Sequence, residues 1–414
     1  MDSQQLQSME KPLLSEESTI QQPPKIAMGR AIIFLTNIIT GIGLLGIPYC
    51  FRSGVGTNLI VIIFIAAISY FSFVCLIDSA AKSGVSDYYN LMSVSFGKPR
   101  FNIIPQLTTI IVLFGVNIIY AQFSCKIIQA VLDEIKGVPS WCYSRWFLVF
   151  ASVGLITFPI TMLKSVGALS YVSMSALVIA VCYIIHDVVM FAKQPFDPQH
   201  QLKIFTLNNI FIPSLAIQCT SFTCHPFIFG TLGQMQSNTP KRQAVAMFFS
   251  TLAATVLYIL GGIFPYLTLF DGILDSVILS YYPKGEVFTI IIKALYSILL
   301  LLTSPNLLFF MRQAFDAMIF QDRPMTTFRW ILEGGGILLC AALIAINVQS
   351  VNTIFSFIGG LACPVMSYII PAIYYIRICK RDSMPKFIMA WCLLVIGVAF
   401  IVICMYDNIR SLAK

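Results

Sequence analysis

The chain has 414 residues, of which 58% are hydrophobic and only 11% are charged. A soluble globular domain carries roughly 25% charged residues, so this chain lacks the polar surface that a water-exposed protein needs. The composition therefore excludes a cytosolic enzyme, a disordered regulator and a secreted disulfide scaffold. It predicts a chain that faces lipid over much of its area.

The first 30 residues are polar, contain three prolines and include no apolar segment of the kind found in a signal sequence. We interpret residues 1–30 as a disordered tail on the cytosolic side of a membrane. Within this tail, residues 10–14 resemble an acidic dileucine sorting signal for endosomes or vacuoles.

Eleven apolar runs follow the tail, and each is close to the roughly 20 residues that a helix needs to cross a bilayer. The runs lie at about 31–51, 58–80, 103–131, 146–163, 166–191, 208–232, 244–269, 287–311, 330–349, 353–376 and 387–405. Continuous runs of this length are too long for the alternating strands of a membrane β-barrel. The sequence therefore predicts an all-α integral membrane protein with eleven transmembrane helices.

Lysine and arginine are distributed unevenly over the connections between these runs. With the N-terminus in the cytosol, the cytosolic connections carry about twice as many of them as the opposite side. We therefore expect a cytosolic N-terminus. The net charge of +8 follows from this orientation, and it does not require a nucleic-acid partner.

The first ten runs divide into two groups of five. We expect a first five-helix repeat at 31–192, a second at 207–376 and an additional eleventh helix at 387–405. Because five is an odd number, the second repeat enters the membrane from the opposite side. Inverted repeats of this kind build transporters whose binding sites lie near the middle of the bilayer.

The first run of each repeat contains residues that interrupt a helix. Residues 41–48 include three glycines and a proline, which weaken a helix, and residues 218–226 are rich in polar groups and end at a proline. Broken backbone at membrane depth is tolerated where it is buried in protein or lines a cavity. Two breaks at matching positions therefore predict a binding site, and closely packed helices with small residues at their interface are the alternative.

The two ends of a broken helix offer opposite chemistry to a ligand. The half-helix that begins after Gly43 would direct free N–H groups and a positive dipole end at an anion. The half-helix that ends near Thr40 would leave carbonyl oxygens free for a cation. A carboxylate beside a monovalent cation is what a symporter of amino acids has to bind.

Three motifs in this order resemble the amino acid/auxin permease superfamily, and within it the sodium-coupled neutral amino acid transporters. The motifs lie at 37–46, 222–226 and 302–305, and the resemblance covers roughly residues 28–405. It implies a LeuT-like fold with a five-plus-five inverted repeat, one extra helix, and breaks in spans 1 and 6. It also implies a secondary active transporter that moves neutral amino acids by alternating access.

The resemblance places the substrate at the two breaks. The carboxylate of the amino acid would bind the backbone of Thr40, Gly41, Ile42 and Gly43. The amino group would bind carbonyl oxygens around Ser221 and Phe222.

The resemblance also implies sodium as the coupling ion. The ion would bind amide, carbonyl and hydroxyl oxygens, which suit a hard cation. These oxygens would come from Asn37, Thr40, Thr303 and Ser304.

Several alternatives stay open. Vacuolar proton-coupled relatives share the Asn-x-x-x-Gly-x-Gly pattern that begins at Asn37, so a proton can replace sodium as the coupling ion. His225, next to the second break, can change charge near neutral pH and would make transport sensitive to pH; the alternative is a neutral histidine that is satisfied by hydrogen bonds between helices. A sensor that binds an amino acid without transporting it is another hypothesis. A membrane enzyme is disfavoured because the three histidines are dispersed and form no catalytic cluster.

The expected partners are a neutral amino acid and the lipid bilayer, and the expected assembly is a monomer. The connection at 192–207 is short, and the chain has no N-x-[ST] glycosylation acceptor, unlike many plasma-membrane relatives. The plasma membrane and a vacuolar or endolysosomal membrane both stay open as locations.

Lys126, Asp187, Lys293 and Glu333 are ionisable residues inside the apolar runs, and such residues are candidates for a functional role. We expect Lys126 and Lys293 to extend their long side chains to the membrane interface. We expect Asp187 and Glu333 to lie near the ends of their spans, within reach of water.

Overall fold

The computed structural model describes residues 25–41, 43–162, 166–193, 202–273, 275–320 and 326–412. Within these ranges, the side chains of residues 166–174, Asp271 and Leu412 are not considered. Most of the predicted tail, including the dileucine-like segment, and the predicted site residue Ile42 lie outside the described residues.

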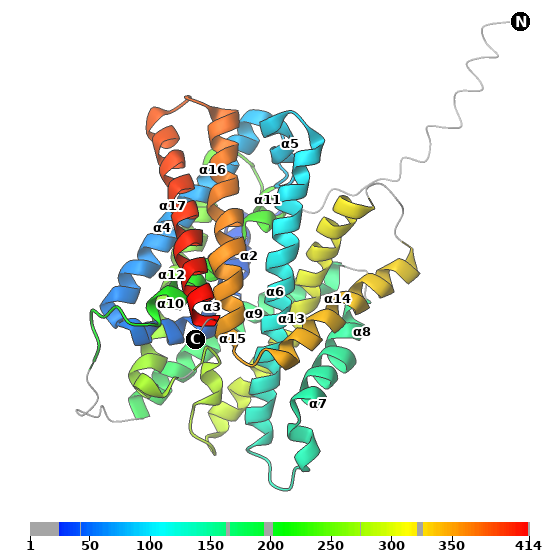
Figure 1. Cartoon of the computed structure of the whole chain (residues 1–414), viewed down its shortest axis with the longest axis vertical. Coiled ribbons are helices and arrows are strands. Elements are labelled where there is room, and N and C mark those ends of the chain that lie inside the picture. Colours follow the sequence, from blue (N-terminus) through cyan, green and yellow to red (C-terminus); the bar gives the residue numbers. More distant parts are fainter. Residues whose placement is uncertain are drawn as a thin grey trace, which may run out of the picture.

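The part of the chain up to residue 193 folds into helices joined by short loops (Figure 1). The helices are α2 (Met28–Thr40), α3 (Gly43–Cys50), α4 (Val55–Ser83), α5 (Asn90–Phe96), α6 (Ile103–Leu132), α7 (Arg145–Phe150), α8 (Phe158–Thr161) and α9 (Val166–Lys193). A π-helical turn, η4 (Ala151–Thr157), connects α7 to α8.

The part after residue 201 is also helical. Its helices are α10 (Phe211–Ser221), α11 (Ile228–Leu232), α12 (Pro240–Leu269), α13 (Val287–Ile319), α14 (Thr327–Asn347), α15 (Val351–Phe357), α16 (Ile370–Tyr374) and α17 (Met384–Leu412). A short 3₁₀ turn, η5 (His225–Phe227), precedes α11. Two π-helical turns, η8 (Ile358–Ala362) and η9 (Val365–Ile369), join α15 to α16, and a third, η10 (Tyr375–Cys379), continues the stretch after α16.

The all-helical membrane class is confirmed, and each predicted apolar run lies mostly in helix. Among the described residues, eight helical stretches are long and apolar enough to cross a membrane, and the bent pair α2–α3 makes a ninth candidate. The predicted spans at 146–163 and 208–232 do not reach this length, because the first is short and the second is divided between α10 and α11. The count of eleven is therefore not confirmed.

Several helices continue beyond their apolar runs, because backbone hydrogen bonding does not stop where hydropathy falls. Helix α12 begins at Pro240, four residues before the predicted run, and proline is suited to the first turn of a helix. The Thr239 hydroxyl caps this helix by accepting from the Arg242 N–H at 3.4 Å. Helix α14 begins in the same way, with the Thr326 hydroxyl accepting from the Arg329 N–H at 3.2 Å.

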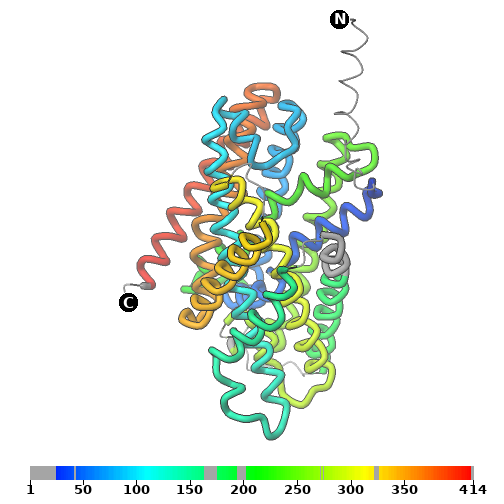
Figure 2. Tube along the Cα trace, turned by 90° about the vertical axis from the view of Figure 1, so that its right-hand side faces the viewer, coloured from blue at the N-terminus to red at the C-terminus, as the bar shows by residue number. Residues whose placement is uncertain are grey.

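The helices differ in how much of their surface lies inside the protein. Of the 18 most apolar consecutive residues in Pro99–Leu132, which contains α6, 67% are buried inside the protein. The corresponding share for the α17 stretch is only 22%. Helix α6 packs along α13 and α14, and α17 packs beside α16 at the edge of the bundle. Figure 2 shows α17, in red, along one flank of the molecule, a position that leaves its apolar outer face to lipid.

The corner between α3 and α4 is connected to α10 by one buried amide side chain. The Asn58 Nδ2 group donates to the Cys50 carbonyl at 2.7 Å and to the Gly54 carbonyl at 2.8 Å. The Asn58 Oδ1 atom accepts from the Gln218 Nε2 group at 2.8 Å. Because these groups are buried, each bond replaces one that water would otherwise supply.

Replacing Asn58 by alanine should lower the free energy of unfolding by about 1–3 kcal/mol, because it leaves several buried polar groups without partners. Thermal unfolding of the purified protein in detergent measures this loss. The control is Asn347→Ala, since the exposed Asn347 side chain bonds, among the described residues, only to the Leu343 carbonyl of its own helix, at 2.8 Å. Equal melting temperatures for the two variants would contradict the role of Asn58.

Candidate functional site

Both predicted breaks are present in the structure. Helix α2 ends at Thr40 and α3 begins at Gly43, and the axes of the two helices differ by 54°. Helix α10 ends at Ser221, and regular helix resumes only at Ile228 after the short turn η5. The glycines in the first segment and the proline in the second explain why neither helix continues.

The two breaks meet at a single side chain from a third helix, Tyr258 of α12. Its hydroxyl lies 2.6 Å from the Ile39 carbonyl oxygen and 3.3 Å from the Thr40 carbonyl oxygen, both at the end of α2. It also lies 2.7 Å from the Ser221 carbonyl oxygen at the end of α10. The Tyr258 side chain is fully buried.

The residues around this point are small or aromatic. A Cβ atom at Gly43 would lie 2.5 Å from the Ser221 Cβ and 2.7 Å from the Tyr258 hydroxyl, so only glycine allows this close approach. The Phe222 ring packs edge-on against the Tyr258 ring, with centroids 5.2 Å apart. The structure thus brings Thr40, Gly43, Ser221 and Phe222 together.

This arrangement places acceptors and donors side by side. The carbonyl oxygens that end α2 and α10 are directed at one point, and the buried start of α3 carries the free N–H groups and positive dipole end of a helix. Such a pair of surfaces complements a group with one cationic and one anionic end. An amino acid zwitterion has this charge distribution.

The predicted sodium ligands make hydrogen bonds to other groups of the protein. The Asn37 carbonyl accepts from the Gly41 N–H at 3.1 Å, within the last turn of α2. The Thr303 hydroxyl donates to the Leu299 carbonyl of its own helix at 2.7 Å, whereas the Ser304 hydroxyl donates to Asn117 Oδ1 of α6 at 2.7 Å. The sodium site at these residues stays a prediction.

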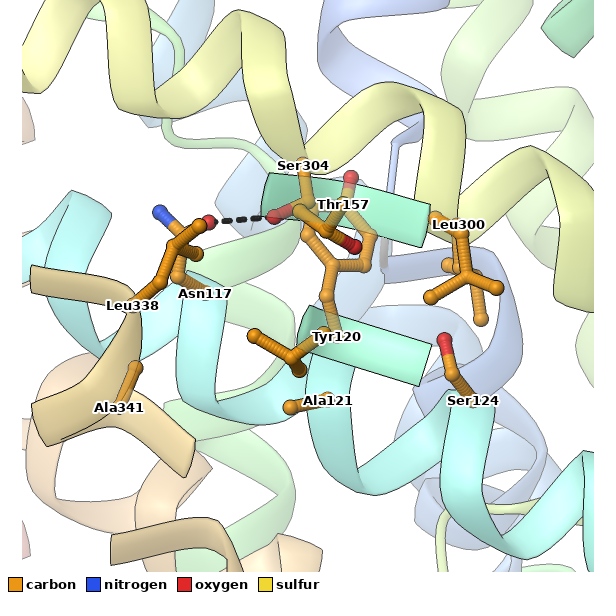
Figure 3. A pocket seen from close by; sticks show the side chains of 11 residues that line it. Asn117, Tyr120, Ala121, Ser124, Thr157, Leu300, Ser304, Leu338 and Ala341 are labelled. Atoms are coloured by element: carbon orange, nitrogen blue, oxygen red, sulfur yellow. Dashed lines mark hydrogen bonds between the residues drawn. The ribbon is translucent and has the colours of Figure 1, made fainter. Parts of the chain in front are cut away.

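Ser304 lies beside a small, mainly apolar cavity between α6, η4, α13 and α14 (Figure 3). The cavity has a volume of about 10 Å³, which is space for one water molecule. Its polar lining comes from Asn117, Tyr120, Ser124, Thr157 and Ser304. The Ser124 hydroxyl is buried and has no hydrogen-bond partner among the described residues.

The sequence analysis did not identify Tyr258 or Asn117 as site residues. Both lie inside long apolar runs, where a single polar group gives no periodic pattern. The available signal is that the hydroxyl of a buried tyrosine or the amide of a buried asparagine needs a partner within the membrane.

His225 is buried next to the second break and contacts α4. Its Nε2 atom lies 3.1 Å from the Ser72 hydroxyl, and its ring stacks on Phe73 with centroids 4.3 Å apart. The neighbouring Thr223 hydroxyl lies 2.9 Å from the Ser367 hydroxyl of η9. These contacts connect the segment between α10 and α11 to two other helices.

Two lysines predicted to reach the interface form ion pairs. Lys126 pairs with Asp275, and Lys293, whose side chain is only 1% exposed, lies 3.3 Å from a carboxylate oxygen of Glu134. The prediction for Lys293 is therefore wrong, because a carboxylate at the end of α6 neutralises its charge inside the protein.

The two predicted interfacial acids are also buried. Asp187 is 0% exposed, and one of its carboxylate oxygens accepts from the Tyr282 hydroxyl at 2.7 Å and lies 3.1 Å from His186 Nδ1. The side chain of Glu333 is 7% exposed and lies 3.0 Å from Arg329 one helical turn away. The prediction of water access is wrong for Asp187, because protein partners replace the water. The Glu333 carboxylate is near Arg329, but its oxygens have no hydrogen-bond partner among the described residues.

Comparisons with known proteins identify the family of the chain. A family model described as "Transmembrane amino acid transporter protein" matches residues 24–410. The chain is 25% identical to sodium-coupled neutral amino acid symporter 2 of Danio rerio, over 88% of this chain and 78% of that protein. It is 23% identical to sodium-coupled neutral amino acid transporter 4 of Pongo abelii, over 94% of this chain and 85% of that protein.

Among solved structures, the fold is similar to that of MhsT in complex with L-phenylalanine. The TM-score is 0.57, with 14% sequence identity, over 94% of this chain and 100% of the MhsT chain. This likeness concerns the fold alone. The family match covers nearly the whole chain, including both helix breaks and Tyr258, and the chain therefore belongs to the transmembrane amino acid transporter family.

Proposed function

We propose that this protein is a secondary active transporter that moves neutral amino acids across a membrane, with sodium as the coupling ion. The observation that carries the proposal is the convergence of two helix breaks, from distant parts of the chain, on one buried point at Tyr258. The names of the two sodium-coupled relatives support the neutral substrate and the ion.

In this proposal, the ammonium group of the substrate binds carbonyl oxygens at the ends of α2 and α10. Its carboxylate binds N–H groups of residues 41–43, at the start of α3 and just before it, and the Gly41 N–H leaves the Asn37 carbonyl to take part. Asn37, Thr40, Thr303 and Ser304 are proposed as sodium ligands. No covalent bond changes. Transport occurs because the site, which lies between the two repeats at 31–192 and 207–376, is exposed first to one side of the membrane and then to the other.

We further propose that the N-terminus is cytosolic, as the excess of lysine and arginine on that side predicts. The proposed assembly is a monomer in the lipid bilayer, of either the plasma membrane or a vacuolar or endolysosomal membrane.

The substrate class can be tested by exchange in proteoliposomes loaded with unlabelled L-alanine. Labelled neutral amino acids in the external solution should accumulate through exchange. Labelled L-lysine and L-glutamate should not, because a second charge would be desolvated at a site without a fixed counter-charge. Faster accumulation of either charged amino acid than of every neutral one would contradict the proposal.

Replacing Thr303 by alanine should raise the sodium concentration for half-maximal uptake by at least about threefold, because the ion loses one oxygen ligand. The control is Thr268→Ala, since Thr268 is also half-buried and its hydroxyl also donates to its own helix, to the Phe264 carbonyl at 2.8 Å. Sodium activation that stays at the wild-type value in Thr303→Ala would remove Thr303 from the proposed site.

A further inference from the structure

We propose that the Tyr258 hydroxyl occupies the place of the substrate ammonium when the site is empty, and that the entering amino acid displaces it. This inference rests on the proposed amino acid transport. It assigns to Tyr258 the role of an internal competitor for the substrate, in addition to its part in joining three helices.

The first argument is the position of the hydroxyl. It lies within 2.7 Å of one carbonyl oxygen from each break, at Ile39 and at Ser221, and 3.3 Å from the Thr40 carbonyl oxygen. A group that binds both broken helices at once has to be close to these same oxygens. The hydroxyl and a substrate ammonium therefore cannot occupy this point together.

The second argument is the number of hydrogen atoms. A tyrosine hydroxyl carries one hydrogen and can make one good donor bond, although three carbonyl oxygens surround it. The remaining carbonyl oxygens then face the oxygen atom of the hydroxyl. An ammonium group supplies three hydrogens and a positive charge, and charge-assisted bonds are roughly twice as strong as neutral ones.

The third argument is the tight space around the hydroxyl. The side chain is 0% exposed, its ring packs against Phe222, and a Cβ atom at Gly43 would lie 2.7 Å from the hydroxyl oxygen. An ammonium group cannot be added beside the hydroxyl without a clash. The tyrosine side chain must therefore rotate or shift with α12 when the substrate binds.

This displacement has a cost that substrate binding must overcome. The bonds from Tyr258 to the two breaks stabilise the empty site and are lost when the substrate enters. Removing the hydroxyl therefore destabilises the empty protein but makes the substrate bind more tightly. A tyrosine that merely supports the site would have the opposite effect on affinity, because its loss would loosen the site in every state.

The test compares wild type with Tyr258→Phe, which keeps the ring and its contact with Phe222. Wild-type protein should take up labelled L-alanine into proteoliposomes. In Tyr258→Phe, we expect the KM for L-alanine to fall about threefold to tenfold, the range that one hydrogen bond corresponds to. The melting temperature without substrate should fall in the same variant, and saturating L-alanine should raise it by more than in wild type.

The matched control is Tyr374→Phe in α16. The buried Tyr374 hydroxyl also donates to one backbone carbonyl, that of Tyr88, at 2.7 Å, but it belongs to another part of the bundle. Its variant should lose thermal stability with no change in KM. A fall of KM in Tyr258→Phe alone therefore separates competition with the substrate from a structural effect.

A second probe is L-lactate, which has the size of L-alanine but carries a hydroxyl instead of the ammonium group. With one donor hydrogen, it gains nothing by displacing Tyr258, so it should not inhibit L-alanine uptake in wild type. Inhibition by lactate as strong as by unlabelled alanine, or an unchanged or raised KM in Tyr258→Phe, would overturn the inference. Absence of uptake in wild type would instead contradict the proposed function itself.

Discussion

Replacement of Gly43 by alanine is expected to lower amino acid uptake at least about tenfold. The added methyl group would lie 2.5 Å from the Ser221 Cβ and 2.7 Å from the Tyr258 hydroxyl oxygen, well inside van der Waals contact. Either α3 has to move, or both α10, which carries Ser221, and α12, which carries Tyr258, have to move. Overpacking of this kind costs about 1–3 kcal/mol. The movement changes the point where the two breaks meet, so the affinity for the amino acid should fall more than the stability of the protein.

Uptake of labelled L-alanine into proteoliposomes, together with the melting temperature, measures both effects. The matched control is Gly336→Ala in α14, where an added Cβ would find no atom within 4 Å. This variant should fold and transport like wild type. If the Gly43→Ala variant had the same uptake rate and KM as wild type, the close contact between α3, Ser221 and Tyr258 would not be needed for transport.

Replacement of Lys293 by methionine is expected to lower the free energy of unfolding by about 3–5 kcal/mol. The Lys293 and Glu134 side chains are 1% and 7% exposed, so the variant leaves a carboxylate buried without its counter-charge. The Glu134 carboxylate also accepts from the Gly285 N–H at 2.8 Å, which connects the end of α6 to the loop before α13. Thermal unfolding in detergent measures the loss.

The double variant Lys293→Met with Glu134→Gln should recover a large part of the lost stability, because it removes the unpaired charge. Lys193→Met serves as the control. The Lys193–Glu286 pair has a similar N···O distance of 2.9 Å, but its side chains are 50% and 40% exposed, and such a pair contributes about 0–1 kcal/mol. A double variant no more stable than Lys293→Met would contradict the account of a buried ion pair.

The helices and their breaks could be predicted from the sequence because both depend on local composition. A membrane helix requires an apolar run of known length, and its interruption requires glycine, proline or polar residues in that run. The segments 41–48 and 218–226 met these conditions, and the breaks between α2 and α3 and after α10 lie there. The number of membrane spans was predicted from length alone. It is not confirmed at the short α7–α8 segment and at the sixth span, which is divided between α10 and α11.

The contacts between helices could not be predicted in this way. In a soluble helix, the polar face identifies the side that faces water, but helices α6, α12 and α13 are apolar on nearly all sides. The sequence therefore does not reveal that Tyr258 faces the breaks or that Ser304 faces Asn117. The pairing of Lys293 with Glu134 joins residues 159 positions apart, and only the packing of α6 against α13 creates it.

The central claim is that a sodium gradient drives neutral amino acids through a site at the two helix breaks. The most direct measurement is uptake of labelled L-alanine into proteoliposomes, with an inward sodium gradient and an inward proton gradient imposed separately. We predict concentrative uptake with the sodium gradient, and none with potassium in place of sodium or with the proton gradient alone. Equal concentrative uptake driven by the proton gradient without sodium would contradict sodium coupling and favour the proton-coupled alternative.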